Sequence, residues 1–137
     1  MRTILPTIDR TTILLYESQH IVLRYLVIFL EACGFIIQSE VSRLDDLKEK
    51  VSKTKPDVII VSHFEQALAL RAVNDIMGIT EAPIILCTSL CNSEDPRDRL
   101  PAQATGVSAV VSRTPERVGS LVAAIRRCRP RRGSFSD

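Results

Sequence analysis

Residues 56–63 read Pro-Asp-Val-Ile-Ile-Val-Ser-His, and this stretch decides the fold. Residues 58–61 are four β-branched apolar side chains in a row, with no polar residue alternating among them. A strand that is apolar on both faces is typical of the centre of a parallel sheet, where helices cover both sides. Ser62 and His63 follow the run. The stretch therefore predicts a central parallel strand whose carboxyl end carries polar side chains.

Further strands and helices alternate on either side of this strand. Four more strands are predicted, over residues 12–16, 35–41, 82–87 and 107–111. Helices are predicted over residues 21–33, 45–54 and 66–77, from Asp95-Pro96 with a distortion at Pro101, and after Thr114-Pro115. Parallel neighbours need crossover connections, so this order predicts an α/β fold. We expect a doubly wound, five-stranded parallel sheet flanked by five helices.

Composition places the chain among globular proteins of one domain. It has 137 residues, of which 45% are apolar and 25% charged, with five glycines and seven prolines. These values argue against a multidomain enzyme, a disordered chain and a coiled coil. No apolar run is long enough to cross a bilayer, and residues 1–10 lack the apolar stretch of a signal peptide. We expect a cytoplasmic protein that does not bind membranes.

The four cysteines do not form a familiar framework. Cys33 and Cys87 fit small core residues, and two histidines are too few to complete a familiar Cys/His zinc pattern. Only Cys87 and Cys91, spaced C-x3-C, could form a redox or metal site, and a structural role is favoured because no further ligand accompanies them.

Positive charge gathers at the end of the chain. Residues 126–137 contain five arginines and one acid, whereas the net charge of the whole chain is +2. We predict an N-terminal extension over residues 1–10, one domain over residues 11–127, and a basic, flexible tail over residues 128–137. The tail could contact nucleic-acid phosphates, but it has no reading helix or stacking aromatic groups, so a linker is the favoured interpretation.

In doubly wound sheets the functional crevice lies beyond the carboxyl ends of the strands. The side chains at those ends are Glu17, Ser18, Ser62, His63, Thr88, Ser89, Ser112 and Arg113. No glycine-rich loop follows the first strand, which argues against a nucleotide or flavin cofactor.

Several features together resemble the receiver domain of two-component response regulators. They are the five strand–helix pairs, Pro56-Asp57 before the third strand, Thr88 at the end of the fourth, and the run Gly-Val-Ser-Ala-Val-Val-Ser-Arg over residues 106–113. The resemblance covers about residues 11–127. It implies the flavodoxin-like or CheY-like (βα)5 fold and a role in signal transduction.

The resemblance also implies which residues would carry the chemistry. In receivers two acidic residues after the first strand bind Mg²⁺ together with an acceptor aspartate, and here these positions hold Glu17, Ser18 and Ser62. Thr88 matches the hydroxyl that binds a phosphoryl oxygen, and Arg113 matches the lysine of the family. Two of three carboxylates are absent, so we expect Mg²⁺ binding to be lost. A serine would form a stable ester in place of the labile acyl phosphate, so aspartyl phosphorylation is excluded at Ser62.

Other departures concern the loop after the acceptor position and the switch residue of the fifth strand. Residues 63–66 replace the loop of the family that contains Pro and Gly, and Val110 replaces the switch aromatic residue. Arg113 is expected to pair with Glu17, the one acid left near it, and the alternative is that it points into water. The sequence therefore predicts a pseudo-receiver that is not an enzyme and that acts through protein contacts.

Two alternatives accompany this interpretation. A small hydrolase would use Ser62 with His63, oriented by Glu17 or Asp57, but consecutive strand residues face opposite sides. The chain could instead be the regulatory part of a transcription regulator that contacts nucleic acid through its arginine-rich tail.

The interaction face of receivers here spans the helix from Asp95, the fifth strand and the last helix. It includes Arg97, Arg99, Val110 and Arg117. We expect an acidic or amphipathic protein partner on this face, with a homodimer as the alternative.

Overall fold

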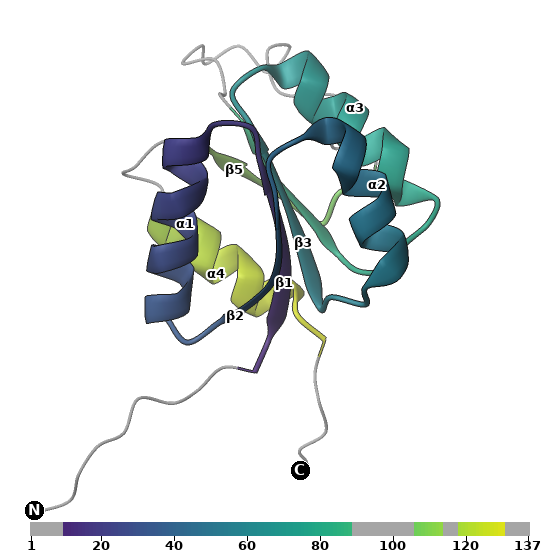
Figure 1. Ribbon diagram of the computed structural model, residues 1–137. Helices are drawn as coiled ribbons and strands as arrows, with labels where there is room; N and C mark the ends of the chain where they lie inside the picture. The colour runs from purple at the N-terminus through teal and green to yellow at the C-terminus, as the bar shows by residue number, and fades with distance from the viewer. Residues whose placement is uncertain (1–9, 89–105, 114–117, 131–137) are drawn as a thin grey trace, which may run out of the picture.

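A parallel five-stranded sheet with the strand order β2-β1-β3-β4-β5 forms the centre of the computed structural model (Figure 1). The structure describes residues 10–88, 106–113 and 118–130. The strands are β1 (Thr12–Glu17), β2 (Ile36–Val41), β3 (Val58–His63), β4 (Ile84–Thr88) and β5 (Ala109–Ser112). The helices in the described ranges are α1 (His20–Ala32), α2 (Leu44–Lys53), α3 (Gln66–Met77) and α4 (Val118–Cys128). The doubly wound α/β fold predicted from the sequence is confirmed.

Five predicted strands and four of five predicted helices lie where they were expected. The helix predicted from Asp95-Pro96 falls outside the described residues. The label α4 therefore belongs to the fifth predicted helix, the one expected after Thr114-Pro115. It runs to Cys128, one residue into the stretch predicted as a flexible tail. The guanidinium of Arg126 lies 5.9 Å from the centre of the Phe35 ring, so the first arginines of the basic cluster belong to the folded domain.

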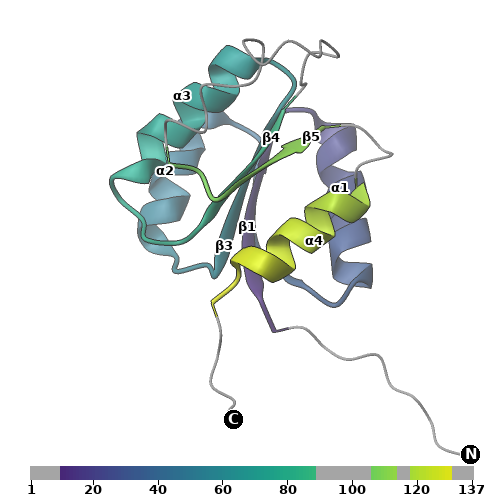
Figure 2. The same ribbon diagram turned by 180° about the vertical axis from the view of Figure 1, so that it is seen from behind.

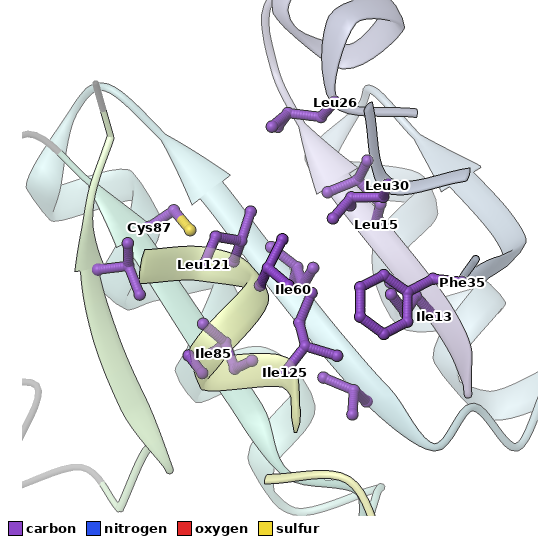
Figure 3. Close-up of a cluster of buried hydrophobic side chains, with 14 of the residues drawn as sticks. Ile13, Leu15, Leu26, Leu30, Phe35, Ile60, Ile85, Cys87, Leu121 and Ile125 are labelled. Atoms are coloured by element: carbon purple, nitrogen blue, oxygen red, sulfur yellow. The ribbon is translucent and has the colours of Figure 1, made fainter. Parts of the chain in front are cut away.

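Helices cover both faces of the sheet. Helices α1 and α4 lie on one face, and α2 and α3 lie on the other, as the two opposite views show (Figures 1 and 2). Along β1, Ile13 and Leu15 belong to the core cluster under α1 and α4, whereas Leu14 and Tyr16 belong to the cluster under α2 and α3. Figure 3 shows the first of these clusters. The alternation explains why the run over residues 58–61 of the central strand contains no polar residue: both of its faces are covered.

The register of the strands aligns polar residues at one edge. Every residue of β3 is buried, in agreement with the apolar run that predicted a central strand. Glu17 of β1 is the register partner of Ser62 on β3, and Ser62 is the partner of Cys87 on β4. Thr88 is the partner of Ser112 on β5. The carboxyl ends of these neighbouring strands therefore meet in one small region.

Two local contacts secure this arrangement. Gly34 ends α1 with a φ of 98°, and the Phe35 amide donates a hydrogen bond of 3.1 Å to the Leu30 carbonyl, which closes the helix end. At the amino edge of the sheet, the Thr12 amide donates to Oδ2 of Asp57 at 2.9 Å, and the Asp57 amide donates to Oγ1 of Thr12 at 3.0 Å. In the described part of the chain, no helix has the length and apolar character that a membrane span requires.

Candidate functional site

Glu17 is the centre of a buried polar network at the carboxyl edge of the sheet. It ends β1 and its side chain is completely buried. Its Oε1 accepts a hydrogen bond from Ser62 Oγ at 2.5 Å, and its Oε2 accepts one from the Gln19 amide at 2.8 Å. A buried carboxylate requires such partners, because it has lost its hydration. Both of its oxygens are used.

Arg113 supplies the positive charge that balances Glu17. Its backbone amide donates to the Thr88 carbonyl at 3.0 Å, which fixes the chain just beyond β5. Its Nε lies 3.0 Å from Oε1 of Glu17, and its Nη2 lies 2.8 Å from Oε2. This is the paired, two-point geometry that makes arginine–carboxylate contacts strong. The side chain of Arg113 is only 13% exposed, so the predicted ion pair is confirmed and the alternative of a solvated arginine is wrong.

Ser62 occupies the position between the two charges. Its hydroxyl donates to Glu17, and its oxygen accepts a longer contact of 3.3 Å from Nε of Arg113. Both hydrogen-bonding functions of the hydroxyl are therefore used within the protein. Glu17, Ser62 and Arg113 are called the Glu–Ser–Arg network below. The charges of Glu17 and Arg113 balance, and both carboxylate oxygens and the serine hydroxyl are hydrogen-bonded.

The other two residues predicted for this pocket do not join the network. In the described ranges, Ser18 Oγ and Thr88 Oγ1 are buried and have no hydrogen-bond partner. Thr88 contributes only its backbone carbonyl, to the Arg113 amide. The register explains this: Thr88 is opposite His63, one residue beyond Ser62, so its side chain leaves the sheet on the other face. Of the five residues predicted for this pocket, Glu17, Ser62 and Arg113 are hydrogen-bonded to one another, and the role of the five as a degenerate phosphorylation pocket stays a prediction.

His63 faces away from Ser62, as the alternation along a strand requires. Its Nδ1 accepts a hydrogen bond of 2.9 Å from the Glu65 amide, and its ring lies near those of Tyr16 and Phe64. Burial lowers the pKa of His63 below its ordinary value. Asp57 begins the turn into β3 at the opposite end of the strand and bonds to Thr12. The serine, histidine and acid of the hydrolase alternative are therefore not assembled.

Gln19 and Phe64 belong to the site although the sequence did not single them out. Nη2 of Arg113 donates to Oε1 of Gln19 at 2.7 Å, and the guanidinium lies 6.0 Å from the centre of the Phe64 ring. The only signal for Gln19 was its place just before α1, at the strand end where functional residues gather. Nothing in the sequence marks Phe64 as a site residue, because an aromatic side chain after a strand usually belongs to the core.

The residues at this edge do not fit a Mg²⁺ ion. Mg²⁺ needs hard anionic oxygens that are free to coordinate it. Both oxygens of Glu17 are bonded to protein groups, and the guanidinium of Arg113 lies against them. Within the described ranges, no group of three or more His, Cys, Asp or Glu side chains could hold a metal. In this arrangement the carboxylate of Glu17 is bonded to Arg113, and the loss of Mg²⁺ binding stays a prediction.

The remaining predicted residues divide into two groups. Cys87 is a buried core residue, and burial raises the pKa of its thiol to about 12. Val110 is half-buried and packs against the core under α2 and α3, and its predicted place in the interaction face stays a prediction. The other members lie outside the described residues, and their predicted roles stay predictions: Ser89, Cys91, Arg97, Arg99 and Arg117.

Comparison with known proteins identifies the fold. No protein-family model and no curated protein sequence matches the chain. Solved structures do match it. The response regulator domain of CheB from Thermotoga maritima is 17% identical with a TM-score of 0.72, and the match covers 88% of this chain and 96% of that one.

Two further structures agree with this match. A DNA-binding response regulator of the LuxR family from Staphylococcus aureus is 21% identical with a TM-score of 0.70, covering 86% of this chain and 98% of that one. A structure of the P1 domain of CheA3 in complex with CheY6 from R. sphaeroides gives 15% identity and a TM-score of 0.67, covering 88% of this chain and 97% of that one. The receiver-domain fold implied by the resemblance is confirmed.

Proposed function

We propose that this chain is a signal-transduction module of the two-component type, an atypical receiver that acts through protein contacts without aspartyl phosphorylation. The fold supports the first part of the proposal, because its structural neighbours are receiver domains. The Glu–Ser–Arg network supports the second part and is the observation that carries it. A receiver needs free carboxylates at this edge, and the one present is already neutralised by Arg113.

Electrostatics oppose the entry of a metal ion and a phosphoryl group. A divalent cation would have to displace the guanidinium of Arg113 from Glu17 or lie beside it. Like charges at close range in a buried site repel strongly, because little water screens them. Removing one partner of a buried ion pair typically costs about 3 to 5 kcal/mol, which a weak metal site with a single carboxylate does not return.

Ser62 is a poor nucleophile in this setting. Its hydroxyl donates to Glu17, whose two oxygens are also hydrogen-bonded by Arg113, so no group of the network is free to act as its base. Ser62 is also completely buried. These contacts support a role in which the module does no chemistry, and they favour it over the hydrolase alternative.

A protein partner is the remaining part of the proposal. One structural neighbour was solved as a complex between CheA3 P1 and CheY6, so this fold supports contacts between proteins in that case. We propose that the present chain likewise acts on a protein, with an acidic or amphipathic surface as the expected partner and a homodimer as the alternative. A cytoplasmic location and an absence of membrane binding stay predictions.

The experiment is a phosphorylation and metal titration of the unmodified protein. Acetyl phosphate or beryllofluoride is added together with Mg²⁺, and backbone amide spectra and the intact mass are recorded. We expect no mass increase and no saturable shifts at Ser62 or Thr88. Saturable shifts of these amides at millimolar Mg²⁺, or a phosphoryl adduct, would show that the network opens and that the proposal is wrong.

A further inference from the structure

A cavity of about 400 Å³ lies next to the Glu–Ser–Arg network, between α1 and α4, and it is open to solvent beside the exposed Ile21 and Tyr25. Tyr25 and Leu26 of α1 and Leu121 of α4 form apolar walls, and Cys87 of β4 adds to the floor. Leu26, Cys87 and Leu121 are labelled in the close-up of this core (Figure 3). Three polar residues belong to its lining: the half-buried Arg113 and the completely buried Ser62 of the network, and the half-buried Ser112 of β5.

The size of the cavity is that of a ligand site. Pockets that bind small molecules have volumes of about 300 to 1,000 Å³, mostly apolar walls and a small number of polar groups. The cavity beside α1 has all three properties, so its shape indicates an apolar molecule of moderate size.

Arg113 supplies the hydrogen-bond donor. In the described part of the chain, its side-chain hydrogen bonds leave from Nε and Nη2, to Glu17, Ser62 and Gln19. The second terminal nitrogen, Nη1, makes no hydrogen bond to a described residue, so it can donate to water or to an acceptor atom of a ligand. A guanidinium has five N–H donors and accepts no hydrogen bond, so only an acceptor atom can satisfy this nitrogen.

Charge decides the chemical class of the acceptor. Glu17 already balances Arg113, so an anionic ligand would leave the site with one net negative charge. That charge would lie close to the carboxylate of Glu17, and like charges repel. A neutral oxygen receives the hydrogen bond without this cost.

We propose that this cavity binds a small, neutral, mostly apolar molecule with one acceptor oxygen, such as an aryl ketone, an ester or a lactone. The ligand lies between α1 and α4 and its oxygen accepts a hydrogen bond from Arg113. This site goes beyond the proposed function, because neither the fold nor the loss of phosphorylation requires it.

Three probes of similar shape test the class of ligand. Acetophenone has the acceptor oxygen, ethylbenzene lacks it, and benzoate adds a negative charge. Each is titrated into the full chain while backbone amide spectra are recorded. We expect saturable shifts at Leu26, Cys87 and Leu121 with acetophenone, about tenfold weaker binding of ethylbenzene, and still weaker binding of benzoate.

Two matched variants test the place of binding. Leu121→Phe adds volume to a side chain that lines the cavity, whereas Ile125→Phe adds it one turn along α4, at a completely buried residue away from the lining. We expect Leu121→Phe to keep the melting temperature and abolish acetophenone shifts. Ile125→Phe should lower the melting temperature, because the core there has no free space. If Leu121→Phe does not fold, Val22→Phe fills the cavity from the half-buried side of α1.

The outcomes that would overturn the proposal are separate from those of the phosphorylation experiment. No saturable shift with acetophenone or ethylbenzene would show that the cavity takes no such ligand. Equal affinity for these two probes would remove Arg113 as the donor, and preferred binding of benzoate would contradict the charge argument. Unchanged acetophenone shifts in the filled variants would place the binding elsewhere. None of these results depends on Mg²⁺ or on a phosphoryl donor.

Discussion

Arg113→Met removes the cation of the Glu–Ser–Arg network and leaves Glu17 completely buried with no opposite charge. Two hydrogen bonds to the carboxylate are lost with the guanidinium, at 3.0 and 2.8 Å. Removing one partner of a buried ion pair costs about 3 to 5 kcal/mol, because the remaining charge is uncompensated. At about 4 °C per kcal/mol for a domain of this size, the melting temperature should fall by roughly 12 to 20 °C.

A double-mutant cycle separates the pair from the two side chains. Glu17→Gln alone leaves Arg113 unpaired, and the double variant with Arg113→Met leaves no buried charge. We expect the double variant to be more stable than the sum of the single changes predicts, with a coupling of about 2 to 3 kcal/mol. Urea denaturation followed by circular dichroism, with melting curves as a second measurement, gives each free energy of unfolding.

The chain offers a matched control. Arg24 and Glu40 form an ion pair of 3.2 Å on the surface, where their side chains are 56% and 39% exposed. Arg24→Met should cost no more than about 1 kcal/mol, because water screens exposed pairs. A cost for Arg113→Met as small as that of Arg24→Met, or a coupling near zero, would refute the view that the network is a buried structural unit.

Three further predictions concern other parts of the molecule. Ser62→Asp alone should take up little phosphate from acetyl phosphate. The double variant with Ser18→Asp should be labelled measurably, because Mg²⁺ needs both carboxylates. Strong labelling of the single variant would contradict this prediction. Since burial lowers the pKa of His63 from 6.5, the unfolded chain binds a proton that the folded chain does not, so the free energy of unfolding should fall as the pH drops below 6.5. Urea titrations on both sides of that pH should show this loss reduced in His63→Gln, and an equal loss in both proteins would contradict it. Gly34 has a φ of 98°, so Gly34→Ala should cost about 1 to 2 kcal/mol. At Gly78, with a φ of −83° and nothing within 4 Å of an added Cβ, alanine should be neutral or stabilise by up to about 1 kcal/mol, and equal costs at both glycines would refute the strain argument.

The strands were predictable because their signal is local. The apolar run over residues 58–61 identified the central strand, and its polar end identified the edge where the site lies. Gly34 likewise marked the end of α1, since a left-handed residue is needed there. These features depend on neighbours in sequence, and any chain with the same local pattern would show them.

The membership of the site was only partly predictable. Ser18 and Thr88 lie at strand ends, but their side chains do not reach the Glu–Ser–Arg network. Gln19 joins the network through its amide and its side chain, although no motif contains it. Which strand-end side chain faces which side depends on the register between strands, and a shift of one residue reverses it.

The sequence by itself determined the order of the elements, the parallel sheet, and the replacement of two carboxylates by Ser18 and Ser62. Only the tertiary structure decided that Arg113 turns inward and binds Glu17, a residue 96 positions away in the chain. The reason is that an arginine side chain stays in water unless a partner of opposite charge is fixed in place, because burial of an unpaired charge is costly. Strand pairing puts Glu17 beside Ser62 with no water to hold its charge, and the guanidinium then becomes its best available partner.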